Sequence, residues 1–201
     1  MKTGQTSSTP RGRSQRERVL RAAMEIFATQ GFRGASLDAV ADAAGMTRQG
    51  LLHYFPSKVQ LLLGVLEVRS EDNNALVARL IEQSHGFADA LLALARHNQD
   101  QPELIRLFTV LAAESVDVGH PGHERFVERY RRVRRRVTDR VAIEQREGRL
   151  SDRIAPGSLA ILIVAVMDGL QLQHLLDPDS IDMAGPLADL LALLAPVSSR
   201  T

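Results

Sequence analysis

Apolar residues recur along most of the chain at intervals of three and four positions, the spacing of a helix that buries one face. Glycine and proline stand at separated points and do not alternate with short β-branched segments, so the pattern disfavours a sheet protein. It predicts an all-α protein of about nine helices. The expected helices cover residues 14–31, 37–44, 48–54, 57–85, 87–98, 102–116, 123–147, 156–176 and 183–194.

Two of these predicted helices are short and joined by a tight turn. Ser36 and Thr47 are expected N-caps, and the helix N-termini that they cap can offer amides and a hydroxyl to phosphate. Gly45 is expected where the first short helix ends, because glycine adopts a positive φ without steric strain. Pro56 ends the second. This succession predicts a helix-turn-helix, whose second helix lies in the DNA major groove.

The second short helix carries polar side chains that suit the groove. Arg48 and Gln49 can make bidentate hydrogen bonds to the edges of guanine and adenine, and His53 lies on the same polar side as Thr47. Gly50 would let the backbone approach DNA closely. On the other side of this helix, Leu52 and Phe55 are expected to point into the domain.

The excess of positive charge lies at the N-terminal end of the chain. The formal net charge is +1, yet residues 1–58 hold nine Lys and Arg against four Asp and Glu. A basic end on a nearly neutral protein indicates a polyanionic partner for that end alone. Residues 1–13 are expected to be a disordered basic tail in which Arg11 and Arg13 form either a minor-groove arm or a free, solvated segment. Ser14 and Glu17 are expected to start the first helix as a capping box.

Composition excludes several classes of protein. The chain has no cysteine, which excludes disulfides, thiolate metal sites and cysteine nucleophiles. The polar N-terminus is unlike a signal peptide, and the most apolar stretch, residues 159–167, is too short to span a membrane. We therefore expect a soluble, cytoplasmic protein without membrane contact. No phosphate-binding glycine loop, serine elbow or zinc-protease helix is present, so an enzyme is not expected.

Three stretches between Arg18 and Leu62 resemble, in order and spacing, the DNA-binding domain of TetR-type regulators. They are Ile26–Phe32, Ser36–Thr47 and Leu51–Lys58. The resemblance implies a homodimer that places one recognition helix from each subunit into successive major grooves of double-stranded operator DNA.

The resemblance also implies roles for individual residues. Thr47, Arg48, Gln49 and His53 match groove-facing positions. Leu52 departs from the family pattern, which has a tyrosine there whose hydroxyl contacts phosphate; leucine cannot donate that hydrogen bond. The predicted DNA-binding residues are Ser36, Thr47, Arg48, Gln49, Gly50, His53, Tyr54 and Lys58.

For the C-terminal part, the resemblance implies an apolar effector cavity among the middle helices and a dimer interface made by the last two. Each of the residues concerned has an alternative interpretation as ordinary core. The candidate effector-binding residues are Phe87, Leu91, Leu104, Phe108, Leu111, Glu114, Tyr130, Met167, Gln171 and His174. The candidate interface residues are Ile161, Ala165, Gly169, Leu187, Leu190, Leu191 and Leu194.

Three further patterns are interpreted as structural. His120 and His123 flank a Pro-Gly loop and are expected to serve a turn and a helix cap, so no metal or other cofactor is predicted. The arginines between residues 129 and 136 are interpreted as a solvated helix face, aided by a Glu128–Arg132 pair, rather than as a second DNA site. Asp168, in an apolar segment, is expected to form a hydrogen bond rather than to act as a catalytic acid.

These observations predict an all-α homodimer with residues 14–57 as a helix-turn-helix DNA-binding domain and residues 58–201 as a ligand-binding and dimerisation domain. The expected function is a transcriptional regulator, most directly a repressor released from its operator by a small apolar or amphipathic effector of unknown identity. The alternative is a helical small-molecule-binding protein that has lost sequence-specific DNA binding, which Leu52 alone favours.

Overall fold

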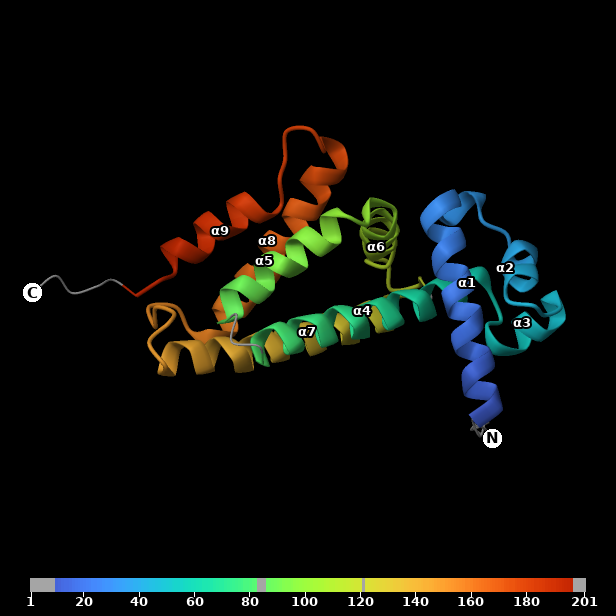
Figure 1. The fold of residues 1–201 in the computed structure, drawn as a ribbon, viewed down its shortest axis with the longest axis horizontal. Coiled ribbons are helices and arrows are strands. Elements are labelled where there is room, and N and C mark those ends of the chain that lie inside the picture. Colours follow the sequence, from blue (N-terminus) through green and yellow to red (C-terminus); the bar gives the residue numbers. More distant parts are fainter. Residues whose placement is uncertain (1–9, 83–85, 121, 197–201) are drawn as a thin grey trace, which may run out of the picture. The chain divides into compact units, whose positions relative to one another are not determined.

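The computed structural model describes residues 10–82, 86–120 and 122–196. These residues form helices and no strands, so the all-α prediction is confirmed. The nine helices of the described residues are α1 (Pro10–Gly34), α2 (Leu37–Ala43), α3 (Arg48–Tyr54), α4 (Lys58–Glu82), α5 (Gly86–Gln99), α6 (Pro102–Glu114), α7 (His123–Arg146), α8 (Pro156–Leu176) and α9 (Ala184–Leu193) (Figure 1).

The chain forms two compact units that divide within α4. The N-terminal unit ends at Arg69 and the C-terminal unit begins at Ser70. The N-terminal unit therefore continues past the expected boundary at residues 57 and 58. The reason is that the first turns of α4 are buried, with Leu61 and Val65 both 0% exposed.

The first helix starts earlier than its sequence indicated. It begins at Pro10, so Ser14 lies inside α1 and the predicted capping box does not start the helix. Proline fits a first helical position, because its fixed φ suits the helix and its missing N–H would have no partner there. Gly31 interrupts the helical geometry as expected, with φ 69° and ψ 169°. Residues 1–9 and the side chains of Arg11 and Arg13 lie outside the described part of the chain.

The N-terminal unit packs its helices around a close approach at Gly64. Val19 and Phe27 on α1, at 0% and 1% exposure, belong to its buried residues. A Cβ atom at Gly64 would lie 2.8 Å from Leu20 Cδ2 and 2.9 Å from Phe55 Cε1. Glycine is therefore the residue that lets α4 pass so near α1 and the end of α3.

In the C-terminal unit, α8 packs along α7 and also contacts α5 and α6, while α9 packs on α5. The last two helices thus bury part of their apolar surface within the subunit. The buried core cluster comprises Phe87, Leu91, Ala95, Ile105, Val141, Leu150, Leu159, Ile163, Met167, Leu170, Met183, Leu187 and Leu191.

The connections on either side of α8 are held by side-chain and backbone hydrogen bonds. Gln145 Nε2 donates to the carbonyl oxygens of Ser151 and Ile154, at 2.8 Å each. The Ser151 amide donates to the Leu194 carbonyl at 2.8 Å, which ties this connection to the end of α9. After α8, His174 Nδ1 donates to the Ile181 carbonyl at 2.7 Å. These contacts hold both ends of α8 in place.

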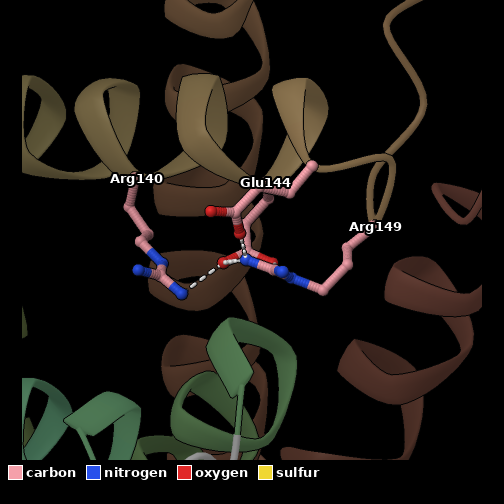
Figure 2. Close-up of polar contacts among 4 residues, drawn as sticks. Arg140, Glu144 and Arg149 are labelled. Carbon is pink, nitrogen blue, oxygen red and sulfur yellow. Dashed lines mark hydrogen bonds and ion pairs between the residues drawn. The ribbon is translucent and has the colours of Figure 1, made fainter.

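A buried carboxylate joins the end of α7 to the residues that follow it. Glu144 is 3% exposed and accepts hydrogen bonds from Arg149 Nε at 2.6 Å and Arg149 Nη2 at 3.1 Å. Arg140 forms an ion pair with the same carboxylate, and Figure 2 shows the two guanidinium groups reaching it from opposite sides. The hydrogen bond from Arg149, together with the charge of Arg140, lowers the pKa of Glu144.

Among the described residues, α8 is the one helix long and apolar enough to cross a membrane by length and composition. The prediction made from the sequence rested only on the most apolar stretch, residues 159–167, which is shorter than the 21-residue helix. Its contacts with α5, α6 and α7, and the burial of Leu159 and Ile163, at 1% each, are those of a core helix. The cytoplasmic location stays a prediction.

Candidate nucleic-acid interface and effector site

The turn between α2 and α3 has the geometry that the sequence predicts. Ser36 Oγ accepts a hydrogen bond from the Ala39 amide at 3.0 Å, and Thr47 Oγ1 accepts one from the Gly50 amide at 3.1 Å. Both residues are therefore N-caps, as expected. Gly45 follows α2 with a φ of 64°. Local hydrogen bonds thus fix the direction in which α3 leaves the turn.

The outer side of α3 is polar and its inner side is apolar. Arg48, Gln49 and His53 are exposed. Leu51 is 0% exposed and Leu52 only half-buried, so the expectation that Leu52 points inward is corrected in favour of Leu51. Phe55 is 3% exposed, as predicted. The helix therefore presents groups able to read base edges on the side opposite its core contact.

Arg48 is held by an acid that the sequence interpretation did not single out. Its Nη1 lies 2.8 Å from Asp38 Oδ2, and both side chains are 58% exposed. Asp38 stands in the first turn of α2 and Arg48 is the first residue of α3, ten positions later. An acid and an arginine at these two helix starts are visible in the sequence, but their contact depends on how the turn brings the helices together.

Space is limited beside the start of α3. A Cβ atom at Gly50 would lie 3.3 Å from Thr47 Oγ1 and 3.7 Å from Met46 Cε. A side chain here would therefore press on the hydroxyl that caps the helix. Crowding within the protein therefore favours glycine at position 50, in addition to the close approach to DNA that the sequence suggested.

Two of the predicted DNA-binding residues lie at the C-terminal end of α3 and at the start of α4. The ring of Tyr54, which is half-buried, meets that of His53 edge-on with centroids 5.6 Å apart. Lys58 Nζ donates to the Arg33 carbonyl at 3.3 Å and lies 4.8 Å from the centroid of Phe32. Partial burial lowers the pKa of Lys58. These contacts position the ammonium group next to the end of α1.

Most of the candidate effector-binding residues are buried in the C-terminal unit. Phe87, Leu91 and Met167 belong to its core cluster, and Leu104, Phe108 and Leu111 are buried on α6. Gln171 and Tyr130 are half-buried.

Two candidate polar anchors need correction. Glu114 is exposed at the end of α6, so it does not line a buried site. His174 is 6% exposed, but its Nδ1 donates to the Ile181 carbonyl, so this nitrogen holds the α8–α9 connection rather than facing an effector.

One polar pair lies between α7 and α8. Tyr130 Oη donates to Asp168 Oδ2 at 2.8 Å, which confirms that Asp168 forms a hydrogen bond. Burial raises the pKa of Asp168, while the hydrogen bond from Tyr130 and the charge of Arg129 act against that rise. Burial and the nearby carboxylate raise the pKa of Tyr130. The hydroxyl therefore stays protonated and serves as a donor.

Arg129 links this pair to aromatic rings on α6 and α7. The Arg129 guanidinium lies 4.3 Å from the ring centroid of Phe108 on α6 and 5.9 Å from that of Tyr130. Phe108 packs against Phe126 with centroids 5.3 Å apart. Helices α6, α7 and α8 thus bring an acid, a phenol and aromatic surface together, which is a combination typical of sites for amphipathic ligands.

The candidate dimer residues divide into two groups. Ile161, at 54%, and Ala165 are exposed on α8, and a Cβ atom at Gly169 would meet open space. Leu187 and Leu191, at 0% and 6%, are buried in the subunit core, so their assignment to an intersubunit contact is corrected. Leu190 and Leu194 are half-buried.

The exposed side of α8 continues beyond the residues that were singled out. Leu162, Leu172 and Leu176 are 50%, 47% and 77% exposed. Leu162 lies beside Ile161, and Leu172 and Leu176 continue the side of Ile161, Ala165 and Gly169 at helical spacing. On α9, Leu193 is 82% exposed. These leucines are visible in the sequence. Their exposure could not be predicted, because α8 is apolar on most of its circumference and the pattern does not distinguish a buried side from an exposed one.

His120 before α7 and His123 at its first position stabilise a turn, as predicted, but the predicted helix cap is wrong, because the N-cap is Gly122 and no side chain in the described part of the chain caps α7. His120 Nδ1 accepts from the Gly122 amide at 3.1 Å and lies 3.0 Å from Ser115 Oγ, and His123 Nδ1 donates to the Ser115 carbonyl at 2.9 Å. No group of three or more potential metal-ligating side chains is found in the described residues.

The arginine-rich side of α7 matches its interpretation except at Arg129, whose guanidinium packs on Phe108. Arg132 and Glu128 form an ion pair at 3.7 Å, and Arg131, Arg135 and Arg136 are exposed. A solvated helix face accounts for this part of α7.

The chain is similar to regulators along most of its length. Residues 19–65 match the model for bacterial regulatory proteins of the tetR family, and residues 85–196 match that for the C-terminal domain of BetI-type transcriptional repressors. The HTH-type transcriptional repressor SCO4008 of Streptomyces coelicolor is 30% identical over 149 residues, which cover 74% of each chain.

Other similarities are either shorter or more distant. The HTH-type transcriptional regulator RutR of Escherichia coli is 40% identical over 53 residues, so the match spans 26% of this chain and only 25% of RutR. A crystal structure of a TetR-family regulator from Rhodococcus has the same fold, with a TM-score of 0.74 at 21% identity, covering 90% of this chain and 98% of that one. The helix-turn-helix, the fold and the two matching models together place the chain in the TetR family of bacterial regulatory proteins.

Proposed function

We propose that the protein is a ligand-responsive transcriptional regulator that binds double-stranded operator DNA as a homodimer, most directly as a repressor. The observation that carries the proposal is the polar side of α3, where Arg48, Gln49 and His53 stand exposed opposite the buried Leu51. A short, capped helix with such side chains fits the major groove, and Arg and Gln are the side chains that pair bidentately with guanine and adenine. The match to a repressor C-terminal domain favours repression.

The homodimer is proposed from the apolar side of α8. A contiguous exposed apolar stripe on a helix indicates a protein interface, and residues of small size such as Ala165 and Gly169 let two helices approach closely. Leu172 and Leu176 extend the stripe. In this arrangement α8 and α9 of one subunit pack against those of its partner.

The effector site is proposed beside Tyr130 and Asp168. Phe108 on α6 and Met167, which directly precedes Asp168 on α8, are buried and supply apolar surface. An apolar or amphipathic molecule with one polar end fits such surroundings. It releases the operator if it binds better to a conformation of low DNA affinity, since a ligand shifts an equilibrium only by its differential affinity for the two states.

Fluorescence anisotropy tests the DNA-binding proposal. The full-length protein is titrated onto labelled duplexes selected by the protein from a random library, with a scrambled duplex as competitor and across a salt series. We expect binding that resists the competitor and that Arg48→Ala weakens by at least about tenfold. Arg131→Ala, which removes an exposed arginine from α7, is the matched control and should bind as the wild type does.

Two results would contradict the proposal. If Arg131→Ala weakened binding as much as Arg48→Ala, the DNA contact would belong to the α7 face. If no selected duplex bound at low salt, the alternative of a small-molecule-binding protein without DNA recognition would replace the regulator, and the missing phosphate contact at Leu52 would be its basis.

Light scattering after size exclusion tests the dimer. Leu172→Glu places a charge on the apolar side of α8 and should yield monomers, because an unpaired charge is unfavourable in a buried interface. Val116→Glu, at a 77% exposed valine outside α8 and α9, is the control and should leave the dimer intact. A dimeric Leu172→Glu protein, or a monomeric wild type, would contradict the proposed interface.

A further inference from the structure

The ion pair between Asp38 and Arg48 spans the turn of the helix-turn-helix. Asp38 Oδ2 accepts a hydrogen bond from Arg48 Nη1 at 2.8 Å, and more than half of each side chain is exposed. Solvent screens such a pair, so its contribution to fold stability is small. The caps at Ser36 and Thr47 and the buried Leu51 already hold α2 and α3 in place. Its effect must therefore be sought in how it orients the arginine.

The geometry leaves a defined part of the guanidinium available. An arginine side chain carries five N–H donors in a planar fork. With Nη1 bound to Asp38, the edge formed by Nε and Nη2 remains for a partner. Two parallel donors on one edge match the N7 and O6 acceptors that guanine presents in the major groove.

We propose that Asp38 is a positioning residue for DNA sequence recognition, which holds Arg48 so that it reads a guanine instead of binding a phosphate. This inference rests on the proposed function, in which α3 enters the major groove. Without the tether, a long flexible arginine at the start of α3 can turn to the DNA backbone, where a phosphate attracts it whatever the sequence. The carboxylate opposes that turn in two ways: it binds Nη1 directly, and its negative charge is repelled by phosphate.

Loss of the Asp38 carboxylate should therefore weaken the preference for the correct base and make DNA affinity more dependent on salt. Arg48→Ala removes the contact with the base. Asp38→Ala keeps the arginine but lets its guanidinium bind a phosphate instead of the base. Losing one bidentate contact reduces the preference for the correct base by about tenfold. A new phosphate contact in each subunit makes the dependence of log K on log salt steeper by about one per subunit. A residue with a merely structural role would alter neither the preference at a single base pair nor this slope.

The experiment compares base preferences and salt dependence for the full-length wild type and five variants: Asp38→Ala, Asp38→Asn, Asp42→Ala, Arg48→Ala and the double variant Asp38→Ala with Arg48→Ala. Sites are selected from a random duplex library by the wild type, Asp38→Ala, Asp38→Asn and Asp42→Ala, and binding to the wild-type site and to its single-base variants is then titrated across a salt series. Asp42 is the matched control, since it is an exposed acid on the same helix and contacts the turn through its backbone carbonyl, which accepts the Gly45 amide. Removing either acid changes the net charge equally.

We expect Asp38→Ala to lose about tenfold of the preference for G·C at one position of each half-site and to show the steeper salt slope. Asp38→Asn, which keeps an acceptor but no charge, should change in the same direction by less. Asp42→Ala should keep the wild-type base preference. In an Arg48→Ala background the Asp38 substitution should have no further effect on base preference, because the residue acts through that arginine.

Several outcomes would overturn the inference while leaving the proposed function intact. One is a base preference in Asp38→Ala that equals that of the wild type. Another is a loss of base preference in Asp42→Ala as large as that in Asp38→Ala, which would mean that the change in net charge causes the effect. A third is a loss of preference in Asp38→Ala that persists unchanged in the Arg48→Ala background. Failure of the wild type to select any site would instead contradict the proposed function, and the inference with it.

Discussion

Replacing Glu144 with glutamine tests whether a buried carboxylate holds the end of α7 to the α7–α8 connection. The substitution keeps the shape of the side chain and one acceptor oxygen but removes the charge. Glu144 is 3% exposed and accepts two hydrogen bonds from Arg149, while Arg140 pairs with it from the preceding turn. The Glu144 carbonyl also accepts the Arg149 amide at 2.8 Å, so backbone and side chain act on the same connection.

The expected magnitude follows from these contacts. A hydrogen bond to a charged group contributes about 1.5–3 kcal/mol. Solvent replaces part of that contribution, since Arg149 is 48% and Arg140 24% exposed. Because the amide retains one acceptor as well, we expect Glu144→Gln to lower the free energy of unfolding by about 2 kcal/mol at pH 7.

The loss should depend on pH in a defined direction. The pKa of Glu144 is lower in the folded protein than its unfolded value of about 4.3. A lowered pKa means that the stabilisation is fully present above the unfolded pKa and disappears as pH falls through the folded one. The difference in unfolding free energy between wild type and Glu144→Gln should therefore shrink at acidic pH.

Urea unfolding at fixed protein concentration, from pH 7 to pH ~4 and below, measures both effects. Glu147→Gln is the matched control, because Glu147 pairs with the same Arg149 but is 51% exposed. Its effect should stay below about 0.5 kcal/mol. The reasoning is refuted if Glu144→Gln is as stable as the wild type at pH 7, or if its deficit does not decrease with acidification.

Two other substitutions test packing and polar pairing by the same unfolding assay. Gly64→Ala should destabilise the protein by about 1–3 kcal/mol, because a Cβ would lie within 3 Å of two core side chains. Gly157→Ala is the control, because a Cβ there would meet nothing within 4 Å, and it should change stability by less than about 0.5 kcal/mol. Equal effects of the two substitutions would contradict the close approach at Gly64. Tyr130→Phe should lose about 1–2 kcal/mol at pH 7 by removing the hydroxyl that donates to the half-buried Asp168. Tyr54→Phe is the control, and a Tyr130→Phe protein as stable as that control would argue against the pair.

Local sequence signals predicted the helices and the turn well. Ser36, Thr47 and Gly45 act within a few residues of themselves, so their roles follow from side-chain chemistry and backbone sterics. The family membership and the expectation of a regulator rather than an enzyme are confirmed, since the matching proteins are regulators. The predicted start of α1 at Ser14 was wrong, because Pro10 can begin a helix as readily as Ser14 can cap one.

Features that depend on tertiary packing were less predictable. Adjacent Leu51 and Leu52 on a seven-residue helix give too short a pattern to decide which one is buried. A leucine stripe such as that of Leu187 and Leu191 looks the same whether it packs within a subunit or against a partner. The Asp38–Arg48 pair is ten positions apart, and nothing in the sequence fixes the turn closely enough to predict the contact.

The most direct test of the account maps contacts on the DNA itself. Methylation interference at guanine N7 is measured on a site selected by the wild-type protein, since N7 lies in the major groove where Arg48 is proposed to bind. We expect two clusters of interfering guanines related by two-fold symmetry, with centres about 10 base pairs or a multiple of that apart, and loss of these signals in Arg48→Ala. A protein that binds with no interference in the major groove, or with a single asymmetric cluster unaffected by Arg48→Ala, would contradict the account.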